Sequence, residues 1–463
     1  MGDFLTFETC RLGKMVQSVP VSETDTLKNI IHRFKFQNTP YPILSFIAKG
    51  GNSMVYDCDT VVRKVCNSYW TDCSSLRELI ILGLCKKIGC KFLPEMKKWE
   101  IDETTGEISF VMEKYQEVGK KDLKKGKMGI LEALTVLHGY GILHADLKKD
   151  NVMKKDDHCI VIDFSNSEWV YPPFTRIDYL SLSTNCPQVV PSNLEQYPQQ
   201  YWQYDMWAFS NLCQEKTVED PIKRPTKNDY TKTVSLKKIV SPDYPGHLKS
   251  KFIRSEGLKN KEYMVMKPDF DQFVKSQNTI DILYPSTVNY CKEREKLLDR
   301  SLGEVRKMGY QIQVWFYAIQ LFDWFSEKIE GDGSGTSGKE VVNCDSKLLM
   351  VCFDLSLRIL QNEQLEQKID KEMEMELLRS GLIPPKFVVG VCVVKFMEEN
   401  VKNEKPLFYD INRLDWMILK EMNKVINVNG DKYLMKKGGE NWNEFIKDHL
   451  YNPLYEDKFE KDF

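Results

Sequence analysis

The chain has 463 residues, of which 42% are hydrophobic and 29% charged, and its formal net charge is −2. This length exceeds what one hydrophobic core usually organises, so two domains are expected, and the composition excludes a chain dominated by disorder. The near-neutral charge and the pI of about 6.4 give no global field that would attract nucleic acid or anionic lipid. We therefore expect neither nucleic acid nor membrane as a partner.

The cysteines and the first residues of the chain indicate in which cellular compartment the protein is expected. Thirteen cysteines are scattered from Cys10 to Cys392, without a C-x-x-C pair or a cluster at zinc-ligand spacing. Reduced thiols in the cytoplasm or the nucleus are expected. The start, MGDFLTFETCRLGK, lacks the apolar core of a signal peptide, and the longest apolar runs, such as FVVGVCVV, are too short to span a membrane. These features predict a soluble protein.

The N-terminal half changes from β-rich to helical. Residues 1–40 are polar and mixed and are expected to form an N-terminal extension. After it, the runs ILSFIA, MVYDC, VVRKVC and ISFVMEKY have β-forming composition and surround one helical stretch, SSLRELIILGLCKKI. Beyond about residue 125 helices dominate, beginning with MGILEALTVLHGYG. We predict an α+β fold, with a β-rich lobe at 41–115 and a helical lobe at 116–280.

The C-terminal half is predicted to form a separate all-α domain. Residues 215–285 are rich in Lys, Asp and Pro, and their sequence does not indicate a secondary structure. Four amphipathic stretches then follow within 285–445, ahead of a tail at 446–463: REKLLDRSLGEVRKMG, QIQVWFYAIQLFDWFSEKI, SKLLMVCFDLSLRIL and INRLDWMILKEMNKVI. The segment GDGSGTSG has the composition of a flexible loop.

The clearest chemical pattern is HADLKKDNV followed by VIDFS. This pattern resembles the catalytic loop and the metal-binding motif of protein kinases, and the phosphoryl transfer that the resemblance implies depends mainly on positioning and on neutralising charge. Asp146 could orient a substrate hydroxyl, and Lys148 could neutralise a γ-phosphate. Asn151 and Asp163 offer the hard oxygen ligands that Mg²⁺ prefers. A polar loop between two buried strands would not require these fixed offsets.

These motifs resemble the catalytic loop and the metal-binding motif of eukaryotic-type Ser/Thr protein kinases. The resemblance implies a bilobal kinase-like fold, ATP and Mg²⁺ as cofactors, and protein hydroxyls as substrates. It adds Lys64, which ends VVRK and would bind the α- and β-phosphates, and Glu78 on the next helix, which would pair with Lys64. The implied catalytic residues are Asp146, Lys148, Lys64 and Glu78, and the implied metal ligands are Asn151 and Asp163.

The phosphate-covering loop matches the family less well. AKGGNSMV keeps Gly50 and Val55 but has Ala48 and Ser53 where the family places its outer glycines. A Gly-Gly-Asn turn also occurs in hairpins that bind no ligand. The nucleotide-binding residues that the resemblance implies are Gly50, Gly51, Ser53, Val55, Lys64, Glu113 and Tyr115.

Other departures carry expectations of their own. Ala145 replaces the family's Arg, so we expect activity without phosphorylation of an activation loop. Ser165 replaces the glycine after Phe164, which resembles the kinases of herpesviruses and other large DNA viruses, and a viral protein would act in its host cell. Asp205 in DMWAF resembles the residue that anchors the catalytic loop, although a helix N-cap is an alternative.

The C-terminal stretches are similar to a cyclin box. Arg294, Leu297 and Asp299 resemble its first helix, FDWF at 322–325 the end of its second, and SKLLMVCFDLSLRIL its third, with a long insertion at 361–380. Lys347 matches a family lysine that binds the kinase helix, whereas Lys386 stands where cyclins carry a glutamate. The resemblance implies an intramolecular contact between this domain and the Glu78 helix. An unrelated helical extension is the alternative.

Two other functions remain open. A pseudokinase scaffold would bind nucleotide and partner proteins without turnover, and the degenerate glycines favour it. A small-molecule phosphotransferase could use the same H-x-D-x-x-x-x-N pattern, although Lys148 favours protein substrates.

Overall fold

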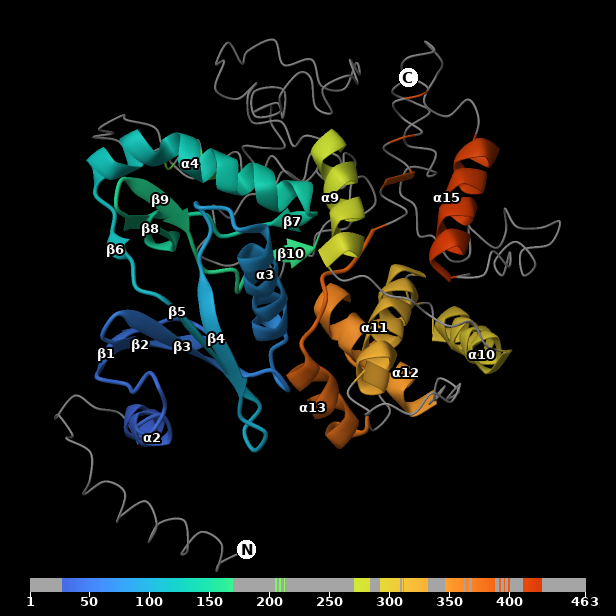
Figure 1. Cartoon of the computed structure of the whole chain (residues 1–463), viewed down its shortest axis with the longest axis horizontal. Coiled ribbons are helices and arrows are strands. Elements are labelled where there is room, and N and C mark those ends of the chain that lie inside the picture. The colour runs from blue at the N-terminus through green and yellow to red at the C-terminus, as the bar shows by residue number, and fades with distance from the viewer. Residues whose placement is uncertain are drawn as a thin grey trace, which may run out of the picture.

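The computed structural model places a β-rich region first and helices after it (Figure 1). This order is compatible with a bilobal, kinase-like α+β fold. VPSN at 190–193 and DPIKRPT at 220–226, which resemble two motifs of the kinase helical lobe, lie outside the described residues. The structure describes residues 27–169, 205, 208–209, 212, 270–283, 292–308, 310, 312–331, 346–361, 363–365, 369–387, 391–392, 395, 399 and 411–426.

A five-stranded antiparallel sheet in the order β1-β2-β3-β5-β4 forms the N-terminal lobe. The four predicted β-rich runs are confirmed as β1, β2, β3 and β5. Strand β4 was not predicted, because its sequence, MKKWEI, carries two lysines on a short run. The strands are β1 (Ser45–Lys49), β2 (Ser53–Cys58), β3 (Val61–Ser68), β4 (Met96–Ile101) and β5 (Glu107–Glu113).

Helix α2 (Leu27–Lys35) precedes the sheet, although the sequence predicted only a polar extension there. It is anchored by buried polar contacts, because His32 Nδ1 lies 2.7 Å from the Tyr56 hydroxyl and that hydroxyl donates to Asn29. Just after the helix, the Phe36 ring lies 3.9 Å from the Arg63 guanidinium. Phe36 belongs to a small hydrophobic cluster with residues of the sheet such as Tyr56 and Val111.

Helix α3 (Ser74–Ile88) confirms the helical stretch predicted between the strands. Its hydrophobic residues are buried around most of its circumference, and it ends at Gly89, whose φ of 68° is the left-handed conformation that glycine adopts without strain. Such all-round burial means that α3 is covered on several sides. In Figure 1 it lies between the sheet and the C-terminal helices α11 to α13.

Helix α4 (Lys120–Gly139) begins earlier than the predicted start at Met128. Its first turn is capped because the Asp122 carboxylate accepts a hydrogen bond of 2.9 Å from the Gly119 N–H. The helix also approaches its neighbours closely. A Cβ atom on Gly126 would lie 2.2 Å from Cys159 Sγ, and one on Gly129 would lie 2.5 Å from the Phe92 ring.

Short strands hold the loops that follow α4. A three-stranded sheet has the order β6-β8-β9, and β7 pairs with β10. The loop predicted to be catalytic leaves β7 and enters β8 through a single 3-10 turn. The bounds are β6 (Gln116–Glu117), β7 (Ile142–Leu143), η1 (Lys149–Asn151), β8 (Val152–Lys155), β9 (His158–Val161) and β10 (Glu168–Trp169).

The four helices predicted in the C-terminal half are confirmed as α10, α11, α12 and α15. Helix α13 lies inside the segment that was predicted to be an insertion, and the Asp370 carboxylate caps it by accepting from Glu372 and Met373. The bounds are α9 (Phe270–Leu283), α10 (Lys292–Met308), α11 (Ile312–Gly331), α12 (Ser346–Gln361), α13 (Lys371–Ser380) and α15 (Ile411–Ile426).

One hydrophobic core joins the two halves. Buried side chains of α3 and α4, such as Leu76 and Leu134, belong to the same contiguous cluster as Trp315 on α11 and Leu355 on α12. The predicted domain boundary near residue 280 stays a prediction, but the helices on its far side share apolar packing with the first half.

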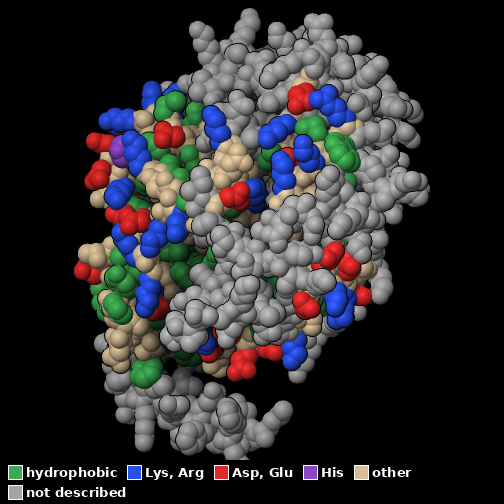
Figure 2. Space-filling model, turned by 45° about the vertical axis from the view of Figure 1, so that its right-hand side comes forward, with side chains coloured by type: hydrophobic (Ala, Val, Ile, Leu, Met, Phe, Trp, Pro, Cys, Tyr) green, Lys and Arg blue, Asp and Glu red, His purple; other side chains and the backbone are tan. Residues whose placement is uncertain are grey.

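None of the described helices is both long and apolar enough to cross a lipid bilayer. The described cysteines are free thiols. On the face in Figure 2, Lys and Arg side chains of the described residues are interspersed with Asp and Glu.

Candidate active site

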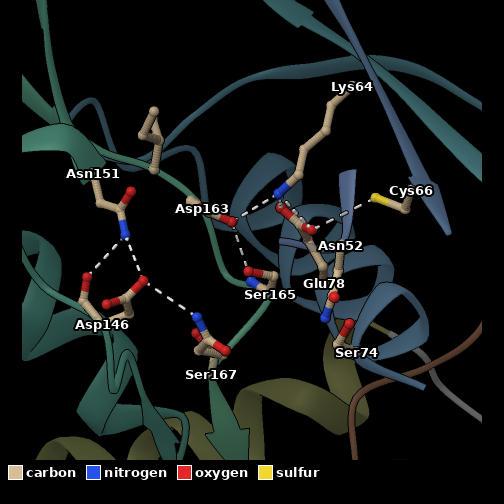
Figure 3. Close-up of polar contacts among 12 residues, drawn as sticks. Asn52, Lys64, Cys66, Ser74, Glu78, Asp146, Asn151, Asp163, Ser165 and Ser167 are labelled. Carbon is tan, nitrogen blue, oxygen red and sulfur yellow. Dashed lines mark hydrogen bonds and ion pairs between the residues drawn. The ribbon is translucent and has the colours of Figure 1, made fainter. Parts of the chain in front are cut away.

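Lys64, Glu78 and Asp163 meet in one cluster of polar contacts (Figure 3). Lys64 Nζ donates to Glu78 Oε1 and to Asp163 Oδ1, both at 2.7 Å. Lys64 comes from β3, Glu78 from α3 and Asp163 from the segment after β9, so three separate parts of the chain converge on one ammonium group. Only a folded arrangement with α3 close to the sheet allows this contact.

The charges in this cluster fix its protonation. Burial alone would lower the pKa of Lys64, but the carboxylates of Asp163 and Glu78 outweigh burial and raise it well above its usual range. Burial alone would raise the pKa of Asp163, but the Lys64 ammonium reverses this and holds it well below its usual range. Lys64 is therefore a cation and Asp163 an anion at neutral pH.

The loop between β7 and β8 concentrates donors on one oxygen of Asp146. Its Oδ2 accepts from Lys148 Nζ at 2.9 Å, from Asn151 Nδ2 at 3.1 Å and from Asn166 Nδ2 at 3.2 Å. Its Oδ1 is buried and has no hydrogen-bond partner in the described part of the chain. A buried carboxylate oxygen without a donor is costly unless another molecule supplies one. Asp146 thus has one oxygen held by three donors and one oxygen without a donor among the described residues.

The backbone under this loop is anchored by Asp205. The side chain is fully buried and accepts from the N–H groups of His144, at 2.7 Å, and Ala145, at 2.9 Å, as predicted for DMWAF. These bonds hold Ala145 at a φ of 63°, which is strained for a residue with a Cβ. His138 Nε2 completes the contacts at 2.9 Å from Asp205.

His144 connects this loop to the segment that carries Asp163. Its Nε2 lies 3.1 Å from the Ile162 carbonyl, which can only accept, and its Nδ1 lies 3.3 Å from the Asp146 N–H, which can only donate. The two contacts assign the proton to Nε2. His144 is therefore a structural residue that ties Asp146 to the neighbour of Asp163.

Asn151 and Asp163 carry side-chain oxygens of the kind that Mg²⁺ prefers. The side-chain amide nitrogen of Asn151 faces Asp146, so the side-chain oxygen Oδ1 points the other way. The backbone carbonyl of Asn151 accepts from the Ile162 N–H at 3.0 Å, which keeps the segments that carry Asn151 and Asp163 together. The Asp163 side chain is 33% exposed. Among the described residues no group of three or more His, Cys, Asp or Glu could hold a metal by itself. Two oxygen ligands suffice for Mg²⁺, which keeps waters and binds phosphate oxygens.

Among the predicted nucleotide-binding residues, Val55 lies beside Lys64, and Gly50, Gly51 and Ser53 lie at the turn between β1 and β2. The turn between β1 and β2 is closed by the Gly50 N–H, which donates to the Ser53 carbonyl at 2.8 Å, and contains Gly51. Val55 lies directly opposite Lys64 in the β2–β3 ladder, so the two side chains share a face. The resemblance to protein kinases implied that these residues bind a nucleotide, and this role stays a prediction.

Glu113 and Tyr115 lie where β5 leads out of the sheet. The Glu113 N–H donates to the Glu95 carbonyl at 3.3 Å, and the Tyr115 hydroxyl accepts from the Glu95 N–H at 3.0 Å. The Glu113 carboxylate pairs with Lys155 at 2.7 Å. These bonds fix the segment between the two lobes.

The C-terminal helices contact the start of α3. Helix α12 packs against α3. The Arg358 guanidinium on α12 lies 5.7 Å from the Tyr69 ring, and Lys371 Nζ on α13 lies 5.9 Å from the Trp70 ring. Further on, the Trp169 ring on β10 lies 6.5 Å from Phe387.

Comparison with known proteins points the same way as the geometry. No protein-family model matches the chain. Over 168 residues, 33% of the chain, the sequence is 25% identical to the rice (Oryza sativa subsp. japonica) cyclin-dependent kinase F-3. This match supports a relationship to the protein kinases. The aligned part spans 36% of the rice protein, about a third of its length.

The structure adds contacts that sequence motifs did not indicate. Asn166, next to Ser165, reaches Asp146, and Glu168 pairs with Arg77 on α3. Neither residue stands in the motif pattern quoted above. In the sequence, the only feature that could have indicated a role for Asn166 and Glu168 was that both are polar and follow closely after Asp163.

Proposed function

We propose that the chain is a Ser/Thr protein kinase that transfers the γ-phosphate of Mg-ATP to protein hydroxyls. The observation that carries the proposal is the convergence of Lys64, Glu78 and Asp163 beside an Asp146 carboxylate with one unsatisfied oxygen. Other buried polar atoms among the described residues also have no partner, such as Arg63 Nε, so the proposal depends on this convergence and not on the unsatisfied oxygen alone.

Each residue has one task in the proposed reaction. Lys64, aimed by Glu78, binds the inner phosphates. Asp146 Oδ1 accepts the hydrogen bond of the substrate hydroxyl and orients it, while Lys148 balances charge on the transferring phosphoryl group. Mg²⁺ bound by Asn151 and Asp163 would neutralise phosphate charge and orient the phosphates. Protein hydroxyls as substrates are supported by Lys148 and by the name of the rice relative.

Asp146→Asn tests the proposal, because it removes the carboxylate and keeps the shape. We expect phosphate transfer to a generic basic protein to fall by at least about 100-fold, the usual contribution of a general base, with nucleotide affinity unchanged. The wild type is assayed in parallel on a panel of small-molecule acceptors. Wild-type protein that binds ATP and transfers nothing would favour a scaffold, and transfer to small acceptors alone would favour a small-molecule phosphotransferase.

We propose further that the C-terminal helices activate the kinase in cis. Arg358 lies beside the loop that leads into α3, and it is also held by Asp354 at 2.7 Å and by Glu374. A displacement of α12 would therefore also move the start of α3, the helix that carries Glu78. Such a contact biases a two-state helix position.

A cyclin-like fold for these helices is supported by one contact. Arg294, from the first cyclin-like motif, donates to Asp323 of FDWF at 3.0 and 2.7 Å in a bidentate, buried pair. Two residues singled out by the resemblance are thus joined. Lys386 pairs with Asp281 on α9, so it takes part in an interaction inside the helical half.

Arg358→Met, compared with Arg294→Met, separates activation from folding. Both changes break a buried Arg–carboxylate pair, at a cost of about 3–5 kcal/mol, but only Arg358 contacts the loop before α3. We expect Arg358→Met to lower kcat/KM about 10-fold more than Arg294→Met at matched temperature below both melting points. Equal losses of kcat/KM in the two variants would contradict activation in cis but not the proposed kinase activity.

A further inference from the structure

Arg77 and Glu168 form an ion pair that the proposed catalytic steps do not use. Arg77 precedes Glu78 on α3 and is 5% exposed, and its Nη1 lies 3.2 Å from Glu168 Oε2. The Glu168 side chain is itself only 16% exposed. A guanidinium this deep requires an anion, because an uncompensated buried charge is strongly destabilising.

Glu168 is fixed to both catalytic segments. In the β7–β10 ladder it lies opposite Leu143, and His144 follows directly. Its neighbour Ser167 donates to the His144 carbonyl at 3.1 Å. Asp163 lies shortly before it on the same segment. Arg77 therefore connects α3 to the backbone from which both Asp146 and Asp163 project.

The pair also has a geometric consequence for the adjacent residue. On a helix, neighbouring side chains move together with the backbone, so a constraint on Arg77 is a constraint on Glu78. Glu78 in turn reaches Lys64 at 2.7 Å. The position of α3 is thus set from the catalytic-loop side as well as by Lys64.

We propose that Arg77 and Glu168 are a built-in positioning pair, which holds α3 so that Glu78 reaches Lys64 without any phosphorylation. The inference rests on the proposed kinase function and deepens its regulation. A carboxylate that is part of the chain is always present, whereas a phosphate must be added. At the catalytic loop Ala145 provides no cation that a phosphate could bridge to Arg77. The pair therefore makes the α3 position constitutive.

The test uses the full chain, treated with a phosphatase, and the variants Glu168→Gln, Arg77→Glu and the double swap Arg77→Glu/Glu168→Arg. We expect Glu168→Gln to lower kcat/KM for ATP by about 10- to 100-fold, to raise KM for ATP and to increase hydrogen exchange in α3. The double swap should recover activity relative to Arg77→Glu alone. Glu421→Gln, which removes a surface i,i+3 pair with Lys424 on α15, is the matched control and should change neither readout.

Two results would overturn the positioning pair. The first is a Glu168→Gln variant whose hydrogen exchange in α3 and whose ATP affinity both equal those of the wild type. The other is loss of wild-type activity on phosphatase treatment. A wild type that transfers no phosphate would instead contradict the proposed function, while α3 exchange and ATP affinity would still decide whether the pair positions the helix.

Discussion

Asp146 illustrates how single atoms set the chemistry of this site. Three donors, from Lys148, Asn151 and Asn166, converge on Oδ2, while Oδ1 has none among the described residues. A carboxylate that is fixed through one oxygen presents the other in a defined direction. Preorganisation of this kind avoids reorientation during the reaction.

Asn166→Ala should therefore lower kcat without weakening ATP binding. Loss of one hydrogen bond to a charged group costs about 1.5–3 kcal/mol, so we expect a fall in kcat of roughly 10- to 100-fold with KM for ATP unchanged. Steady-state kinetics against ATP measure both values. An equal rise in KM would mean that Asn166 contributes to nucleotide binding and not to the orientation of Asp146.

At this scale the sequence indicated the residues that recur at fixed offsets. Lys64, Glu78, Asp146 and Asp163 could be proposed because each has a chemical task and a spacing. Asn166 and the partner of Arg77 could not be proposed, because their contacts depend on how β10 pairs with β7.

Among the elements, α3 and α4 use glycine in opposite ways. Gly126 on α4 has Cys159 Sγ at 2.2 Å from the position of a Cβ, whereas Gly83 on α3 has nothing within 4 Å. In α4 the glycine allows close packing on β9. In α3 it contributes no packing and only lowers helix propensity.

The two glycines predict opposite effects of alanine. Gly126→Ala should destabilise the fold by about 1–3 kcal/mol through overpacking, and Gly83→Ala should stabilise it by about 0.5–1 kcal/mol. Urea denaturation of both variants measures the difference. A neutral Gly126→Ala would mean that Cys159 moves aside at little cost.

Helix α2 gives the N-terminal lobe a pH dependence. Burial alone would raise the pKa of Glu107, but hydrogen bonding to His32 and the charges of His32, Lys35 and Lys28 lower it to about 2. A depressed folded-state pKa contributes stability above the ordinary value of 4.5, and this contribution is lost as the pH falls toward 2.

Melting temperatures of the wild type and Glu107→Gln should therefore differ most at neutral pH. The difference should shrink between pH 5 and pH 3, by roughly the linkage relation for a single carboxyl. A difference independent of pH would show that the Glu107 charge does not hold α2.

Among the described residues a large hydrophobic core joins the two halves of the chain, and a smaller, separate cluster contains Phe36, Tyr56 and Val111. Because the buried cluster runs from α3 and α4 into α11 and α12, we expect a single cooperative unfolding transition. Tryptophan fluorescence and circular dichroism should give coincident denaturation curves, and ATP should shift both equally. Two separated transitions would mean that the C-terminal helices unfold independently.

This continuity was not predictable from the sequence. Amphipathic periods located α10, α11, α12 and α15 closely, although α11 and α12 are buried around most of their circumference and not along one stripe alone. A stripe does not identify the surface that covers it. The polar N-terminal segment likewise concealed α2, whose contacts with the sheet are largely hydrogen bonds and ion pairs.

The contact of α12 with the start of α3 has a consequence for how the protein would respond to its own abundance. Under the proposed activation in cis, activator and kinase are one polypeptide, so their local concentration is set by chain connectivity and not by expression level. Dilution would then leave the specific activity constant, where a two-subunit complex would lose it. Synthesis and destruction of the whole chain would be the means of turning its output up or down.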